Sequence, residues 1–192
     1  MKYLVLNGVT QRKDLRFAYR GTDRNSPRYC SSLPAEHEFN QLWLEAIKEE
    51  QNTGGISDLA KAQRYAELSN RYFPDMHFEV IGISMDNDAS AGGGQLLGYD
   101  IGSGESLIVL AALPFGPIQY GSDEPAIILN EMIRRHFHPK LNEFGLFRTS
   151  EDAEECRRAM IALQSLRPNF YEGGSLELFR ESFKITGVYL IP

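Results

Sequence analysis

The stretch HFEVIGISM, residues 77–85, decides the fold class of this chain. Apolar side chains recur at every second position, so that Ile81 and Ile83 share one face of a strand. Residues 95–101 and 106–113 have the composition of two further strands. The links between the three segments are rich in turn-forming residues and too short for a crossover helix. The sequence therefore predicts an antiparallel three-strand meander at the centre of the chain.

Helices and terminal strands are expected on either side of this meander. Apolar residues with a 3.6-residue period predict the helices, and short β-favouring runs predict a strand near each end of the sequence. The expected helices are 35–51, 57–73, one that begins near 123, 150–166 and a short one at 176–183, and the expected terminal strands are 2–7 and 184–191. This order predicts a single α+β domain over 1–192: an antiparallel sheet, made of the central three-strand meander plus terminal strands, with about four helices packed on one face.

The boundaries of the first two helices have local signals. Glycines 54 and 55 end the first helix, and Ser57 or Asp58 can cap the second. In the first helix, Phe39 and Ala46 belong to the apolar stripe, whereas Glu50 is expected on the solvent side. The two helices should therefore form an antiparallel pair joined by a short link.

The charge is distributed unevenly along the sequence. The chain carries a net charge of −6, yet residues 1–34 hold seven basic and two acidic side chains, and the remainder holds 13 basic and 24 acidic ones. An acidic surface repels nucleic acid and suits a basic partner. Aromatic side chains among the N-terminal arginines resemble a single-strand binding pattern, but the acidic remainder argues against nucleic acid as a partner. The plainer alternative is that the acidity serves solubility alone.

The two cysteines and the apolar runs indicate a cytoplasmic protein. Cys30 and Cys156 are too few and too far apart for a disulfide framework, and Cys156 falls on the apolar stripe of a helix. The N-terminal apolar run is too short for a signal peptide, and the run 107–113 is far shorter than the ~18 residues that a membrane span needs. We therefore expect no membrane partner.

The segments that resemble catalytic or metal-binding motifs lack residues that these motifs require. Residues 86–90 begin like a calcium loop, but Ala91 stands where the turn needs glycine and Leu97 stands where a bidentate carboxylate is needed. Glycines 92–94 come directly before the expected strand 95–101, whereas a phosphate-binding loop precedes the N-terminus of a helix. His136 and His138 lie at a helix end, where two residues separated by one position do not share a face. The sequence predicts no catalytic residue, no metal and no cofactor.

The segment from Asp86 to Glu105 is the best candidate for binding. It brings acidic side chains and one tyrosine to two hairpin turns at the same end of the meander; they are Asp86, Asp88, Tyr99, Asp100 and Glu105. Tyr99 and Asp100 are adjacent on a strand, so they face opposite sides of the sheet. An acidic rim with an aromatic anchor is typical of a protein-binding surface.

The run LLGYDI at 96–101, followed by SLI at 106–108, resembles a motif in immunity proteins of bacterial polymorphic toxin systems. The resemblance implies an acidic cytosolic protein that binds and blocks a cognate toxin. These families are diverse, so the resemblance implies no set of functional residues.

Our leading hypothesis from the sequence is a non-enzymatic binding protein, such as an immunity or inhibitor protein that blocks a basic protein toxin through an acidic surface. The alternative is a small cytosolic hydrolase or transferase with an unfamiliar site. A third hypothesis is a regulatory or scaffold domain that forms homo-oligomers.

Overall fold

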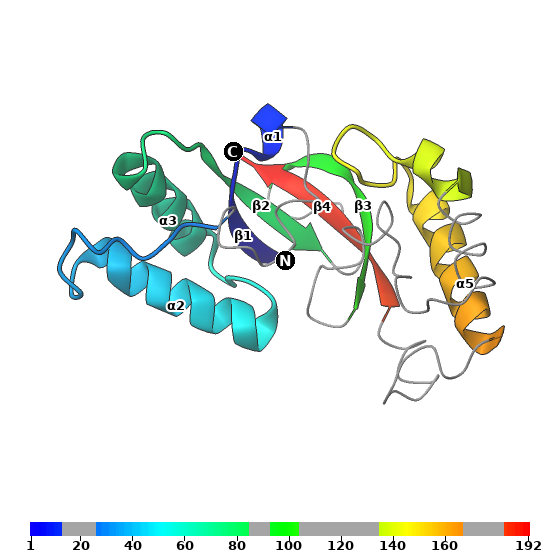
Figure 1. Cartoon of the computed structure of the whole chain (residues 1–192), viewed down its shortest axis with the longest axis horizontal. Helices are drawn as coiled ribbons and strands as arrows, with labels where there is room; N and C mark the ends of the chain where they lie inside the picture. The colour runs from blue at the N-terminus through cyan, green and yellow to red at the C-terminus, as the bar shows by residue number, and fades with distance from the viewer. Residues whose placement is uncertain (13–25, 85–92, 104–134, 167–182) are drawn as a thin grey trace.

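The computed structural model describes residues 1–12, 26–84, 93–103, 135–166 and 183–192 of the chain (Figure 1). The strands in these ranges are β1 (Lys2–Asn7), β2 (Phe78–Ser84), β3 (Gln95–Ser103) and β4 (Phe183–Ile191). The helices are α1 (Val9–Arg12), α2 (Glu38–Thr53), α3 (Leu59–Tyr72), the 3-10 helix η3 (His138–Lys140) and α5 (Ser150–Leu166). The antiparallel sheet and its helices confirm the predicted α+β class. The expected strand 106–113, most of the helix that begins near 123, and nearly all of the helix 176–183 lie outside the described residues.

The strands follow the order β1-β2-β4-β3, and every neighbouring pair is antiparallel. The prediction that β2 and β3 pair as part of a meander is therefore wrong, because β4 lies between them. Val80 of β2 pairs with Ile191 of β4, and Ile101 of β3 pairs with Ile185 of β4. β4 is rich in buried residues, and a strand of this kind is stabilised by a central position where both faces are covered.

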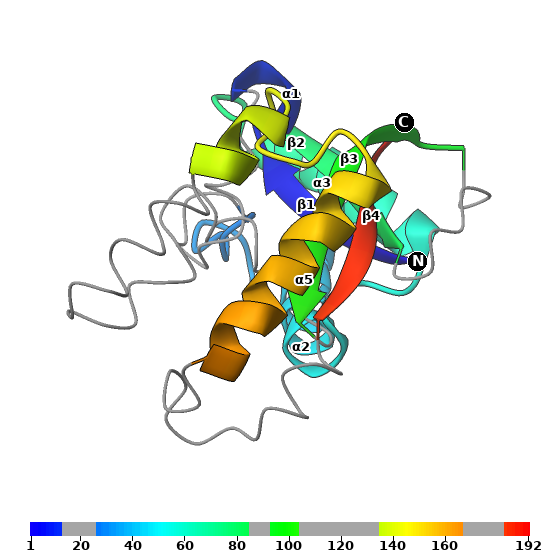
Figure 2. The ribbon, with the colours of Figure 1, turned by 90° about the vertical axis from the view of Figure 1, so that its right-hand side faces the viewer.

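Helices cover both faces of the sheet rather than one, which corrects the second detail of the prediction. Val80 packs in a cluster with residues of α2 and α3, whereas its neighbour Ile81 packs in a cluster with Ala153 and Cys156 of α5. Successive residues of a strand point to opposite faces, so the two clusters lie on opposite sides of the sheet. Figures 1 and 2 show this arrangement, with α2 and α3 on one side and α5 on the other.

The expected residues form the end of α2 and the N-terminal cap of α3. Gly54 ends α2 in a left-handed conformation with φ 72°, and its N–H donates to the Glu50 carbonyl oxygen. The carboxylate of Asp58 caps α3 by accepting from the N–H groups of Ala60 and Lys61. Both assignments confirm predictions made from local sequence.

One residue of α2 departs from its predicted side. Phe39 and Ala46 form the buried stripe of the helix, and Glu50 follows Ala46 by one helical turn. Glu50 is half-buried, so its assignment to the solvent side was wrong. Its charge misled the prediction, because the stripe that begins at Phe39 continues through this position.

Short connections close parts of both sheet edges. Tyr3 of β1 exchanges two backbone hydrogen bonds of 2.8 Å with Ile56, and Tyr99 of β3 exchanges two of 2.9 Å with Phe147. Gly98 permits the second approach, since it has φ 153° and a Cβ there would lie 2.6 Å from the Cβ of Leu146. Such contacts occupy edge groups that would otherwise be open to other strands.

Two asparagine side chains form hydrogen bonds with backbone N–H and carbonyl groups that have no partner in a neighbouring strand. Asn142 accepts from the N–H groups of Phe144 and Leu146 and donates to the Leu97 carbonyl oxygen at 2.6 Å. Asn70 of α3 accepts from the Phe78 N–H at 2.7 Å and donates to the Phe78 carbonyl oxygen at 2.9 Å. The Asn70 carboxamide therefore bonds the first residue of β2 and fixes α3 to the sheet.

Replacing Asn70 with alanine is expected to lower the free energy of unfolding by about 2 kcal/mol, because the N–H and carbonyl of Phe78 lose their partner in a partly buried position. Urea denaturation followed by far-UV circular dichroism measures this loss. The control is Asn52→Ala on the exposed side of α2, where we expect a change within about 0.5 kcal/mol. Equal stabilities of the two variants would contradict the role of Asn70.

Candidate functional site

The predicted binding residues that the structure describes lie in β3. Asp100 is completely buried, so it does not belong to an exposed rim, and Tyr99 is half-buried against the cluster beneath α5. One oxygen of the Asp100 carboxylate accepts from the Ile101 N–H. The other three candidates, Asp86, Asp88 and Glu105, lie outside the described residues. β3 packs against α5. The sequence did not predict that a helix would cover this face of the sheet.

Cys156 lies in the same layer and confirms the prediction of a core cysteine. Burial, followed by the nearby Glu155 carboxylate, raises the pKa of its thiol to about 12. The thiol therefore stays protonated at neutral pH, and a protonated thiol is a poor nucleophile.

The solvent side of α2 and α3 is rich in carboxylates. Residues 35–84 contain nine acidic and four basic side chains. The exposed carboxylates of this region form what we name the acidic layer: Glu36, Glu38, Glu45, Asp58, Glu67 and Asp75. These six carboxylates come from one continuous stretch of the sequence, residues 36–75, and lie on α2 and α3 or in the segments directly next to them.

The cations of α3 are already engaged by carboxylates. Lys61 contacts both Glu45 and Glu49 at 2.8 Å. Arg64 contacts Glu38 at 2.7 Å and Glu67 at 2.8 Å, and Arg71 lies 3.6 Å from Glu67. Hydrogen bonds from Arg64 and Lys61 lower the pKa values of Glu38 and Glu49 respectively, so both carboxylates remain charged well below neutral pH. The surplus charge of the layer is therefore negative.

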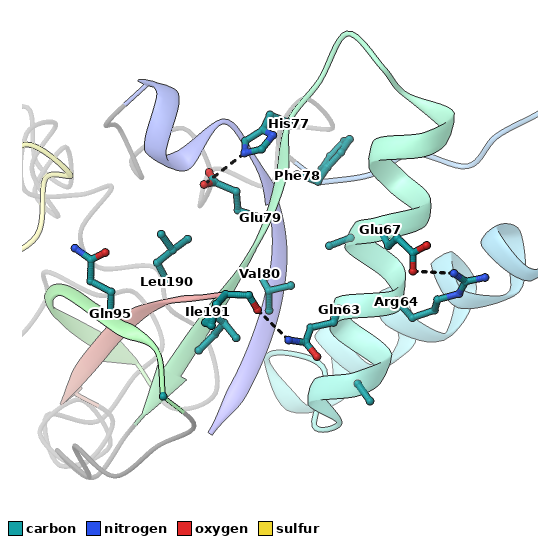
Figure 3. Close-up of a pocket in the computed structure, with 14 residues that line it drawn as sticks. Gln63, Arg64, Glu67, His77, Phe78, Glu79, Val80, Gln95, Leu190 and Ile191 are labelled. Atoms are coloured by element: carbon teal, nitrogen blue, oxygen red, sulfur yellow. Dashed lines mark hydrogen bonds and ion pairs between the residues drawn. The ribbon is translucent and has the colours of Figure 1, made fainter.

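A groove of about 830 Å³ lies beside this layer, between α3 and the ends of β2, β3 and β4 (Figure 3). The buried side chains of Phe78, Val80 and Ile191 contribute apolar surface to it. Gln63 and Glu67 line it from α3. Its volume lies within the range of roughly 300–1,000 Å³ that is usual for ligand pockets.

Several polar side chains of the groove form hydrogen bonds or ion pairs within the protein. Glu79 accepts from the N–H and the hydroxyl of Thr10, and its carboxylate lies 3.8 Å from the Nε2 atom of His77. Gln63 donates to the Pro192 carbonyl oxygen at 2.9 Å. Sequence reasoning missed this groove, because its residues come from four separated elements and share no local pattern.

A second charged cluster lies at the N-terminal half of α5. Lys140 of η3 contacts Asp152 at 3.0 Å and also contacts Glu155, which in turn lies 3.0 Å from the Nε2 atom of His136. These ion pairs fix η3 to α5. Within the part of the chain that the structure describes, no group of three or more His, Cys, Asp or Glu side chains is arranged to hold a metal ion.

The helices of the described ranges include none that is long and apolar enough to cross a membrane.

Comparison of the chain with family models, with curated proteins and with solved structures gives no match. The resemblance of residues 96–101 to immunity proteins thus stays a prediction.

Proposed function

We propose that this chain is a non-enzymatic binding protein that engages a basic protein partner through the acidic layer of α2 and α3. An immunity or inhibitor protein that blocks a basic toxin is a protein of this kind. The observation that carries the proposal is the surplus of exposed carboxylates on a helix pair whose α3 cations are all in ion pairs.

Electrostatic complementarity supports such a role. A surface of one sign raises the rate at which an oppositely charged partner associates and disfavours partners of like charge. The ion pairs also hold the carboxylates of Glu38 and Glu67 in fixed positions, which reduces the entropy lost on binding. The adjacent groove offers apolar surface next to these charges, and a few anchor residues seated in such pockets supply most of the affinity in protein interfaces.

Charge reversal of the acidic layer tests the proposal. We expect the double substitution Glu36→Lys and Asp75→Lys to weaken the partner complex by about tenfold or more, since two attractive charge pairs become repulsive. Both residues are exposed, and they flank the end of the helix pair where His37 contacts Tyr72. The tagged full chain is used to capture proteins from its own organism, and the affinity of each purified, identified partner is then measured at several salt concentrations.

The matched control is the double substitution Glu143→Lys and Glu151→Lys, at exposed positions in the segment before α5 and in its first turn, which changes the net charge equally. The helix α5 lies on the other side of the sheet from α2 and α3. This control should leave the affinity unchanged. A partner that is not basic, an affinity that does not fall with salt, or equal effects of the two double variants would each contradict the proposal.

A further inference from the structure

The N-terminal cap of α2 is a histidine, where serine, threonine, aspartate or asparagine is usual. His37 has an extended backbone with φ −64° and ψ 139°, and its Nδ1 atom accepts a hydrogen bond of 3.2 Å from the Phe39 N–H. The ring therefore satisfies one of the N–H groups that the first turn of a helix leaves without a partner.

This bond fixes the tautomer of the ring. An Nδ1 atom that accepts a hydrogen bond has no proton of its own, so the proton of the neutral ring lies on Nε2. The Nε2 atom lies 3.0 Å from the hydroxyl oxygen of Tyr72, to which it can then donate. The two rings also meet edge to face, with centroids 5.3 Å apart. The neutral His37 ring thus joins the first turn of α2 to the last turn of α3.

A second proton on this ring is incompatible with the cap. It would be placed on Nδ1, where it faces another donor, the Phe39 N–H. It would also add a positive charge at the helix N-terminus, where the helix dipole disfavours cations. The structure shows two ionisable groups that interact with His37: Tyr72 of α3 through a hydrogen bond, and Glu38 of α2 through its charge. The Glu38 carboxylate is already bonded by Arg64 of α3.

We propose that His37 is a proton-sensitive cap, and that its protonation releases the first turn of α2 from α3. Histidine is the side chain whose charge ordinarily changes between pH 5 and 8. The inference concerns the packing of α2 on α3 and holds whether or not the acidic layer binds a basic protein.

Amide hydrogen exchange of Phe39 tests the proposal in the full chain. Acidification from pH 7.5 to 5.5 should lower its protection factor by about fivefold in the wild type, since an N-terminal cap contributes about 1 kcal/mol. In His37→Asn the protection factor should stay constant, because asparagine caps a helix and does not titrate. His138→Asn, at an exposed histidine of η3, serves as the control and should behave like the wild type.

A second measurement needs no variant. The nitrogen chemical shifts of the His37 ring at pH 7.5 report which ring nitrogen carries the proton, and we expect Nε2. A neutral ring protonated on Nδ1 would overturn the proposal. So would a protection factor of Phe39 that falls equally in the wild type and in His37→Asn.

Discussion

Replacing Asn40 with alanine is expected to lower the free energy of unfolding by about 4 kcal/mol. Asn40 is completely buried in α2. Its Oδ1 atom accepts from the Cys30 N–H at 3.1 Å, and its Nδ2 atom donates to the carbonyl oxygens of Cys30, Leu33 and Pro34 at 3.2, 3.3 and 2.9 Å. Each buried group that loses its partner costs about 1–3 kcal/mol, and the cavity adds to this cost.

The loss of stability should also affect the segment before α2, because this segment covers the helix pair. Trp43 of α2 donates to the Pro27 carbonyl oxygen at 3.0 Å, and Tyr65 of α3 lies close to the same oxygen. Trp43 is the only tryptophan of the chain, so its fluorescence follows this region during urea denaturation. We expect the emission of Asn40→Ala to shift to the red at lower urea concentrations than that of the wild type.

Two further variants of α2 test whether the lost hydrogen bonds of Asn40 cause the destabilisation. Asn40→Asp keeps the acceptor but places a carboxylate against three carbonyl oxygens, so it should destabilise the protein at least as much as alanine does at neutral pH. Gln41→Ala removes one exposed hydrogen bond, to the Ala35 carbonyl oxygen, and should change stability by less than about 0.5 kcal/mol. A loss below about 1 kcal/mol for Asn40→Ala would show that the segment is held by other contacts.

Replacing Glu50 with glutamine is expected to stabilise the protein at alkaline pH by about 2–3 kcal/mol. Burial raises the pKa of the Glu50 carboxyl group from its ordinary 4.5 to about 7. One unit of pKa corresponds to about 1.4 kcal/mol, and we reduce the total because the side chain keeps some contact with solvent. Burial, and then the charge of Glu50, also raises the pKa of Tyr65 on the facing helix.

The direction in which Glu50 changes stability with pH follows from proton binding. The folded protein holds the Glu50 proton up to about pH 7, whereas the unfolded chain releases it near 4.5. The contribution of Glu50 is therefore most favourable below pH 4.5, decreases as the pH rises through 7, and is constant above that. Glutamine does not titrate, so the difference between Glu50→Gln and the wild type should be small at pH 4.5 and largest above pH 8.

Glu49 provides a control of opposite sign on the same helix. Hydrogen bonds from Lys61 and from the Ser57 N–H lower its pKa, so the ionised form stabilises the folded state above pH 4.5. Glu49→Gln should therefore be less stable than the wild type at neutral pH, and the difference should shrink as the pH falls. Thermal unfolding in a pH series measures both variants. Parallel curves for Glu50→Gln and the wild type would show that Glu50 is not a buried acid.

Local sequence predicted α2, α3 and α5 to within three residues at each end, but it did not predict α1 or η3. The stripe that begins at Phe39 predicted α2, Gly54 and Asp58 marked the link between α2 and α3, and α5 has the predicted range 150–166. These features depend on residues within a few positions of one another, so a single sequence contains them. The excess of acidic residues was also visible directly in the composition.

Long-range contacts were needed for the sheet order and for the site. Turn-forming residues after β2 indicated a reversal of the chain, but they did not specify that β4 would pair with β2 in place of β3. The burial of Asp100 depends on segments far from it in the sequence, since its carboxylate acts electrostatically on Cys156 of α5, and no nearby residue encodes this. The groove beside α3 has the same origin, because its walls come from separated segments.

The sequence by itself determined the helices α2, α3 and α5, the α+β class and the negative charge of the body. The tertiary structure alone decided which strands are neighbours and which polar side chains are buried. The physical reason is that hydrophobic periodicity specifies which face of an element is buried but not what covers it. Asn40 and Glu50 illustrate this limit, since both are polar residues of α2 and the fold alone brings each against buried neighbours.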